Sequence, residues 1–183
     1  MSFPAFFDTN VLYGALLNDF VLELADRGLF RPLWSEDVLF ELAKNLVKNG
    51  EHPALVEKRV STMEHYFADA MVTGYADLVP AMTNHPKDRH VLAAAVRGGA
   101  EVLVTFDIKD FPPVSVAPFD LEIVHPDDFL LDQLDLHHAP TLRALVELVE
   151  AYDSPAMAID DFLLALIRAG VPKFVDAARS MLY

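Results

Sequence analysis

The stretch Lys87–Phe111, KDRHVLAAAVRGGAEVLVTFDIKDF, decides the fold. Apolar residues at helical spacing follow Asp88 and end at Gly98-Gly99, a pair typical of a helix C-terminus. The run Val102–Val104 has no polar alternation, which predicts a short parallel strand covered on both faces. Three polar side chains come directly after it: Thr105, Asp107 and Asp110. Because ligands of open α/β sheets bind at the carboxyl ends of the strands, this stretch predicts both a fold class and a site.

Two more acidic residues lie upstream in comparable settings. The apolar run Pro4–Phe7 stops at Asp8, and helical spacing resumes over Val11–Gly28. A further helix is predicted from the N-cap Ser35 to Lys48, with Glu41 beside its apolar face. Taken singly, Asp8 fits a helix cap as well as a ligand, and a glutamate at the edge of a core face is more often solvated. The other acidic residues must decide between these readings.

The remaining chain predicts an α/β fold, a parallel sheet flanked by helices with a C-terminal helical appendage. The further expected elements are a helix over 53–68, a short strand over 70–72, a last strand over 121–124, a helix over 126–136, a linker over 137–140, and helices over 142–151, 156–169 and 172–182. We therefore expect two parts, residues 1–136 and residues 137–183.

Composition narrows the classes of function. The chain has 183 residues, 53% of them hydrophobic, which suits one compact domain with an appendage. The absence of cysteine excludes disulfides and thiolate metal sites. No apolar run is long enough to cross a bilayer, and the N-terminus lacks the basic region of a signal peptide, so we expect a cytoplasmic protein with no membrane partner.

The formal charge of −14 argues, by itself, against a nucleic acid partner, because such binding rests on Lys and Arg at phosphates. Divalent cations in one acidic pocket and basic residues at its rim would leave RNA binding open. Carboxylates gathered without a cation repel each other and shift each other's pKa, and Mg²⁺ or Mn²⁺ prefers carboxylate and water oxygens. Such metals activate water and stabilise charge on a phosphoryl group. A basic protein partner is also compatible with this charge.

Four motifs in chain order resemble the PIN-domain ribonucleases of the VapC toxin type. They are FFDTN with Asp8 and Asn10, SEDVLFEL with Glu41, NHPKDRHVLAAAV with Asp88, and LVTFDIKDFP with Thr105, Asp107 and Asp110. The resemblance covers nearly the whole chain, because the tail after residue 137 is similar to the C-terminal extension of one VapC branch.

The resemblance implies a divalent-metal-dependent endoribonuclease that hydrolyses RNA phosphodiesters and is the toxin of a type II toxin–antitoxin pair. Asp8, Glu41, Asp88 and Asp107 would be catalytic and would bind one or two Mg²⁺ or Mn²⁺ ions, with Asp110 as an outer metal ligand. Asn10 and Thr105 would be supporting hydrogen-bond groups. A protein antitoxin, and a homodimer or larger complex, are the partners implied.

Several residues near Asp88 and Asp107 in the sequence are weaker candidates for binding RNA or metal. Lys87, Arg89 and Lys109 are candidates to bind RNA phosphates, although solvated charge is the commoner role of such residues. His85 and His90 flank Asp88, and histidine beside an all-oxygen site is more often structural than a ligand.

Two other functions stay open. One is a catalytically inactive scaffold of PIN fold, and the other is a Mg²⁺-dependent phosphoacceptor of receiver type. A receiver site would need an adjacent acidic pair at its first strand and a lysine with a matching partner, and the sequence has neither.

Overall fold

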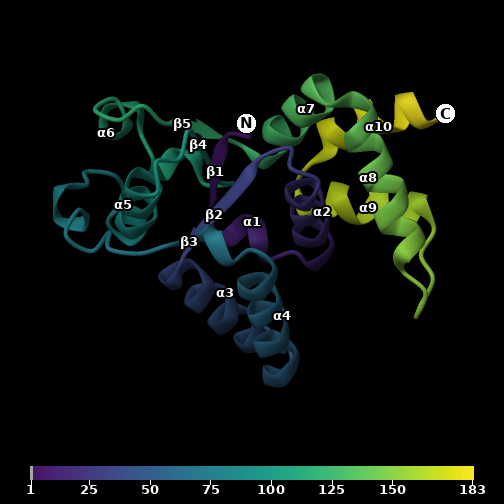
Figure 1. The fold of residues 1–183 in the computed structure, drawn as a ribbon, viewed down its shortest axis with the longest axis horizontal. Coiled ribbons are helices and arrows are strands. Elements are labelled where there is room, and N and C mark those ends of the chain that lie inside the picture. The colour runs from purple at the N-terminus through teal and green to yellow at the C-terminus, as the bar shows by residue number, and fades with distance from the viewer. Residues whose placement is uncertain (1) are drawn as a thin grey trace.

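The computed structural model describes residues 2–183, and its centre is a parallel five-stranded sheet of order β3-β2-β1-β4-β5 (Figure 1). The strands are β1 (Pro4–Phe7), β2 (Arg31–Ser35), β3 (Met71–Val72), β4 (Val102–Val104) and β5 (Glu122–Val124). All four residues of β1 are buried, as expected for a central strand covered on both faces. The predicted fold class, a parallel sheet flanked by helices, is confirmed.

Helices cover both sides of this sheet. They are α1 (Thr9–Leu12), α2 (Ala15–Asp26), α3 (Glu36–Lys48), α4 (Pro53–Tyr66), α5 (Arg89–Arg97), α6 (Pro113–Val116), α7 (Pro126–Leu136), α8 (His138–Ala151), α9 (Ile159–Ala169) and α10 (Pro172–Leu182). In Figure 1, α5 and α6 lie to the left of the sheet, α2 and α7 to α10 lie to its right, and α3 and α4 extend below it. Within residues 2–183, none of the helices combines the length and the apolar character needed to cross a membrane.

Aromatic residues join the C-terminal helices to the sheet and to α2. Phe129 of α7 meets Phe30 edge-on at a centroid distance of 5.0 Å and Phe7 of β1 at 5.6 Å. Phe20 of α2 packs against Phe174 of α10 at 5.4 Å. Such pairs add about 0.5–1.5 kcal/mol each beyond the burial of their area. The helical tail therefore shares the core of the rest of the chain.

A carboxylate of α7 also fixes the start of α10. Asp127 is 2% exposed, and it accepts hydrogen bonds from the backbone N–H groups of Lys173 at 3.0 Å and Phe174 at 2.7 Å. Free N–H groups at a helix start need such acceptors when they are buried. Asp127 thus caps a helix that follows it by more than forty residues.

Two local expectations were wrong. The segment 137–140 was predicted as a linker, but α8 begins at His138, because Pro140 falls in the first helical turn, where its missing N–H would have no partner anyway. Strand β2 was not predicted at all, and it contains Pro32, a residue type that disfavours a strand because it cannot donate a hydrogen bond. The structure tolerates Pro32 because β3 pairs only with Trp34 and Ser35, which leaves Pro32 without a neighbour on that side.

A glycine sets how closely α5 approaches β3. A Cβ atom at Gly98, which ends α5, would lie 2.7 Å from a methyl carbon of Val72 and 3.2 Å from one of Leu33. Real Cβ atoms do not come so close to carbon. Gly98 therefore permits a close approach between the end of α5 and the side chains of Val72 and Leu33, which would have to shift for a larger residue.

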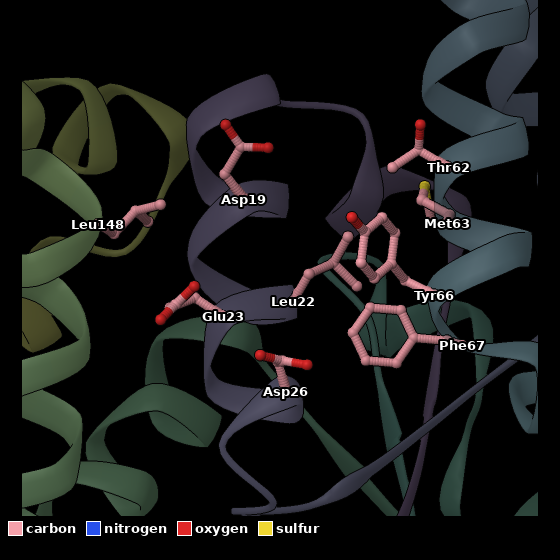
Figure 2. A pocket seen from close by; sticks show the side chains of 9 residues that line it. All are labelled: Asp19, Leu22, Glu23, Asp26, Thr62, Met63, Tyr66, Phe67 and Leu148. Carbon is pink, nitrogen blue, oxygen red and sulfur yellow. The ribbon is translucent and has the colours of Figure 1, made fainter. Parts of the chain in front are cut away.

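A groove of about 270 Å³ lies between α2, α4 and α8 (Figure 2). Three acidic side chains of α2 lie along it: Asp19, Glu23 and Asp26. Asp19 accepts a hydrogen bond from the Tyr152 hydroxyl, and Glu23 forms an ion pair with Arg27 at 2.7 Å. Because two of its three carboxylates already have partners, this groove is a poor candidate for a metal centre.

Candidate metal centre

The four acidic residues predicted to act together line one pocket of about 260 Å³. Asp8 follows β1 and Asp107 follows β4, and these strands are neighbours that end at the same edge of the sheet. Asp88 is the N-cap residue of α5, and Glu41 lies in the middle of α3. The pocket also includes Thr9, Asn10, Tyr13, Asn45, Asn49 and Lys87. The structure therefore brings together side chains that are up to 99 positions apart in the sequence.

Asp8 is the most deeply buried of the four, with 5% exposure. Burial raises the pKa of its carboxyl from 3.8 to about 6, and the charges of Asp88 and Glu41 push the pKa in the same direction. Hydrogen bonds from the Thr105 hydroxyl at 2.8 Å and the Thr9 N–H at 2.7 Å oppose this rise without cancelling it. Asp8 is thus mostly ionised at neutral pH, but its carboxylate is less stable in this pocket than it would be in water.

Asn10 links the acidic residues at the two strand ends. Its side-chain amide lies 3.3 Å from Oδ2 of Asp8 and 3.2 Å from Oδ2 of Asp107. Its carbonyl oxygen accepts from the N–H of Phe106 at 3.2 Å, and this bond fixes which end of the amide faces the carboxylates. Thr105 is fully buried and accepts from the N–H of Asp107 at 3.1 Å. Asn10 and Thr105 therefore orient both carboxylates.

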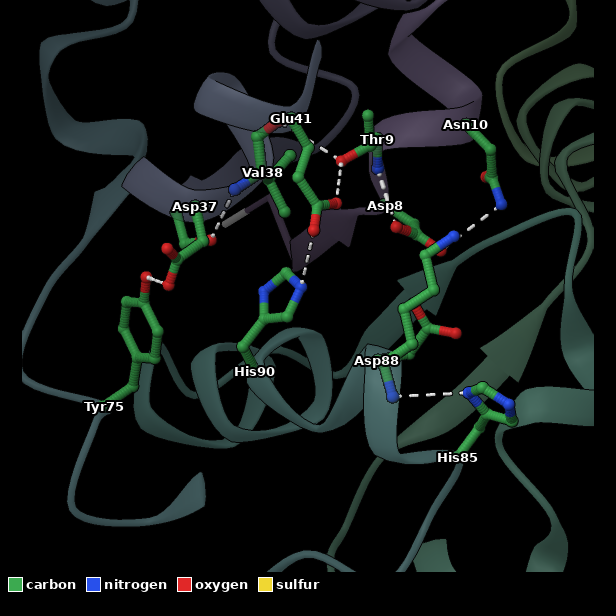
Figure 3. Close-up of polar contacts among 12 residues, drawn as sticks. Asp8, Thr9, Asn10, Asp37, Val38, Glu41, Tyr75, His85, Asp88 and His90 are labelled. Atoms are coloured by element: carbon green, nitrogen blue, oxygen red, sulfur yellow. Dashed lines mark hydrogen bonds and ion pairs between the residues drawn. The ribbon is translucent and has the colours of Figure 1, made fainter. Parts of the chain in front are cut away.

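Glu41 is held from two sides (Figure 3). The Thr9 hydroxyl lies 3.3 Å from Oε2 of Glu41 and 3.2 Å from the carbonyl oxygen of Val38, so its single hydrogen is shared between them. Nε2 of His90 lies 3.2 Å from Oε1. Neither contact was expected from the sequence.

Asp88 makes no side-chain cap hydrogen bond at the start of α5, although its position would suit one. Burial raises the pKa of its carboxyl, and the neighbouring charge of Asp110 raises it further. Oxygen atoms of Asp88 and Asp110 and a ring nitrogen of His85 lie within 4.8 Å of one another. Asp110 therefore lies beside Asp88 and does not line the pocket, and its role as an outer metal ligand stays a prediction.

The three basic residues considered for RNA binding lie in different settings. Lys87 is exposed and lines the pocket. Arg89 is half-buried, and its Nε donates to the carbonyl oxygen of Asn84 at 3.1 Å. Lys109 lines a separate apolar hollow next to Phe111. Lys87 alone is placed to meet a ligand in the acidic pocket, and the phosphate-binding role of all three stays a prediction.

Sequence reasoning missed four polar residues of the pocket wall: Thr9, Tyr13, Asn45 and Asn49. Asn45 and Asn49 follow Glu41 at intervals of four, so helical spacing from Glu41 was the signal that would have found them. Asn49 donates from its amide to the Tyr13 hydroxyl at 2.8 Å. Asn45 and Asn49 extend the polar wall along α3, and Tyr13 contacts its end.

The side chains around this pocket fit a hard divalent cation. Four carboxylates and the side-chain oxygen atoms of Asn45 and Asn49 are the kind of ligands that Mg²⁺ and Mn²⁺ prefer. Within residues 2–183, no lysine or arginine lies at ion-pair distance from any of the four carboxylates. Lys87, which lines the pocket, acts on Asp88 as a nearby charge without forming an ion pair, so the four carboxylates keep an excess of negative charge.

Comparison with known proteins agrees with the fold. Residues 4–109 match a family model described as the PIN domain, which covers more than half of the chain. The chain belongs to the PIN domain family. The C-terminal part of this PIN-domain protein, residues 126–180, matches a model described as the VapC50 C-terminal domain. These matches confirm the resemblance to VapC-type proteins with a C-terminal extension.

One curated relative of this PIN-domain protein is named "Putative ribonuclease VapC50" and comes from Mycobacterium tuberculosis. The two chains are 48% identical over 112 residues, which is 61% of this chain and 66% of the relative. The match thus spans just under two thirds of the relative's length. No solved structure matches the chain.

Proposed function

We propose that this PIN-domain protein is a divalent-metal-dependent ribonuclease that hydrolyses RNA phosphodiesters with Mg²⁺ or Mn²⁺. The observation that carries the proposal is the convergence of Asp8, Glu41, Asp88 and Asp107 on one pocket with no lysine or arginine ion pair among residues 2–183. The raised pKa of the buried Asp8 supports it, because a bound cation would favour the ionised carboxylate. The name of the mycobacterial relative supports the same reaction.

The residues of the pocket divide the work of such a reaction. When bound, a divalent cation would lower the pKa of a bound water molecule and would neutralise charge that develops on the phosphoryl group. The four carboxylates would hold the cation, and Asn10 keeps Asp8 and Asp107 turned toward each other. Lys87, at the pocket, would neutralise a phosphate oxygen of the RNA. No side-chain nucleophile is needed.

We further propose that the protein is a cytoplasmic toxin of a toxin–antitoxin pair. The match of residues 126–180 to the VapC50 C-terminal domain supports this, and the net charge of −14 favours a basic antitoxin that covers the pocket. We also propose that the protein forms a homodimer or a larger complex with the antitoxin. We propose in addition that the chain divides into a nuclease part, residues 1–136, and an extension, residues 137–183.

The activity is tested by incubating the purified chain with a structured RNA and Mn²⁺ or Mg²⁺. We expect cleavage that excess EDTA stops and that Asp8→Asn and Asp88→Asn each abolish. We expect Glu41→Gln to abolish cleavage as well. Its matched control is Glu36→Gln, which should cleave as the wild type does, because Glu36 is an exposed glutamate of the same helix. Cleavage that survives in EDTA, or in both aspartate variants, would refute the proposal.

Two other functions give different results in simple measurements. An inactive scaffold would bind its partners without needing Mn²⁺, so calorimetric titration with Mn²⁺ separates it from an enzyme. A phosphoacceptor domain would be labelled on one aspartate by a small phosphodonor. The convergence of four carboxylates favours the nuclease over both.

A further inference from the structure

His90 is a mostly buried imidazole that the proposed reaction does not use. Its side chain is 18% exposed, and it projects from α5 toward α3 (Figure 3). Both ring nitrogens are shielded from solvent, and within residues 2–183 neither has a hydrogen-bond partner of good geometry. The polar group that Nε2 meets is Oε1 of Glu41, at 3.2 Å. Polar atoms that are shielded from solvent usually form hydrogen bonds, so the buried imidazole of His90 needs an explanation.

The Glu41 side chain keeps a single orientation only if its neighbours restrict its rotamers. Its side chain is 35% exposed and has several rotatable bonds, so a free glutamate here would sample many rotamers. The Thr9 hydroxyl contacts only Oε2, and it shares its hydrogen with the carbonyl oxygen of Val38. His90 contacts the other oxygen, Oε1. The two contacts thus reach both oxygen atoms of the carboxylate, one from each side.

A simpler role for His90 would be to attach α3 to the body of the protein. That attachment exists without it. Val38, Leu39 and Leu42 of α3 are buried in the core. One turn before Glu41, Asp37 accepts a hydrogen bond from the Tyr75 hydroxyl at 2.5 Å. Loss of His90 would therefore free the Glu41 carboxylate more than it would move the helix.

We propose that His90 is a positioning residue whose Nε2 holds the Glu41 carboxylate in the orientation that a divalent cation in the pocket requires. The inference rests on the proposed function, because it gives Glu41 a metal to bind. Groups that orient metal ligands typically change metal affinity by about 10- to 100-fold when they are removed. Because the Glu41 carboxylate would already be ordered, cation binding would cost less side-chain conformational entropy.

The test is Mn²⁺ binding to the full, metal-free chain, followed by the electron paramagnetic resonance signal of free Mn²⁺. We expect His90→Leu to raise the Mn²⁺ Kd about 10-fold. His90→Gln keeps an N–H donor near the position of Nε2 and should recover most of the affinity, whereas His90→Asn is too short and should not. Tyr75→Phe removes the neighbouring polar link to α3 and should bind Mn²⁺ as the wild type does. Circular dichroism shows whether each variant is folded.

A double-mutant cycle separates action through Glu41 from a general effect. We expect His90→Leu to cause no further loss of Mn²⁺ affinity once Glu41 is replaced by Gln. Equal losses in both backgrounds, or equal affinities for the wild type, His90→Leu and His90→Asn, would overturn the role of His90 and leave the metal centre standing. A wild type that binds no Mn²⁺ would overturn the metal centre together with the inference. Mn²⁺ binding that follows the expected pattern without RNA cleavage would refute the ribonuclease alone.

Discussion

Replacing Asp8 by asparagine is expected to make the metal-free protein more stable at pH 8. The carboxyl of Asp8 is 5% exposed, and its burial next to Asp88 and Glu41 raises its pKa to about 6. At pH 8 the folded protein must therefore keep an ionised carboxylate in a poorly solvated place. Asparagine has nearly the same shape and no charge, so it removes this cost.

The pKa values fix the sign and the size of the effect. The folded-state pKa of about 6 lies above the ordinary value of 3.8, so the folded protein holds more protons than the unfolded chain between about pH 4 and pH 6. Stability therefore falls as pH rises through this window and stays low above it. The pKa difference of about two units corresponds to about 3 kcal/mol.

Asparagine also loses an acceptor. The Thr9 N–H and the Thr105 hydroxyl both donate to the carboxylate, and losing one such bond costs about 1 kcal/mol. The net gain of Asp8→Asn at pH 8 is then about 2 kcal/mol, which corresponds to a rise in Tm of about 4–8 °C for a chain of this size.

Urea unfolding in the presence of EDTA, at pH 8 and at pH 4.5, measures this gain. We expect the variant to be more stable than the wild type at pH 8 and about equal to it at pH 4.5, where the wild-type carboxyl is protonated in the folded state. Added Mn²⁺ at pH 8 should stabilise the wild type more than the variant. Asp120→Asn, at an exposed site, should change stability by less than about 0.5 kcal/mol at either pH. A variant no more stable than the wild type at pH 8, or equally favoured at both pH values, would refute the reasoning.

Three further substitutions probe other parts of the structure. Thr105→Val removes the hydroxyl that lowers the pKa of Asp8, so it should raise that pKa above about 6 and weaken Mn²⁺ binding, as measured by carboxyl NMR titration and by calorimetry. Gly98→Ala should destabilise the protein by about 1–3 kcal/mol in urea, because its Cβ would meet the side chain of Val72 at 2.7 Å. Asp127→Ala should cost about 2–4 kcal/mol and increase hydrogen exchange at the start of α10, because it leaves two N–H groups without their acceptor.

Matched variants serve as controls. Thr105→Ser keeps the hydroxyl and should leave the pKa of Asp8 near the wild-type value. Gly14→Ala should be tolerated, since its Cβ would lie 3.9 Å from the nearest heavy atom. Asp128→Ala removes an exposed ion pair with Lys173 and should leave the stability almost unchanged. If a control variant loses as much as its partner, the cause assigned to that partner is wrong.

The sequence by itself determined the elements that carry the acidic residues. The buried runs before Asp8 and Asp107 were recognisable as strands because a parallel strand covered on both faces is apolar throughout. Ser35 marked the start of α3, and its hydroxyl does accept from the N–H of Val38 at 3.2 Å. Strand ends of a parallel sheet share one edge, so local patterns placed Asp8 and Asp107 at that edge, whereas the pairing of β1 with β4 that makes them neighbours came from the structure.

Only the tertiary structure decided which side chains of different helices and loops contact one another. The contact between His90 and Glu41 joins α5 to α3, and the turn of Asp110 toward Asp88 and His85 depends on the path of a loop. Local spacing places a residue on a face of its own helix but does not say which residue of another helix it will meet. Those meetings depend on how whole elements pack, through contacts such as that of Gly98 with Val72. The positions of the carboxylates were therefore predictable, whereas the contacts that orient them were not.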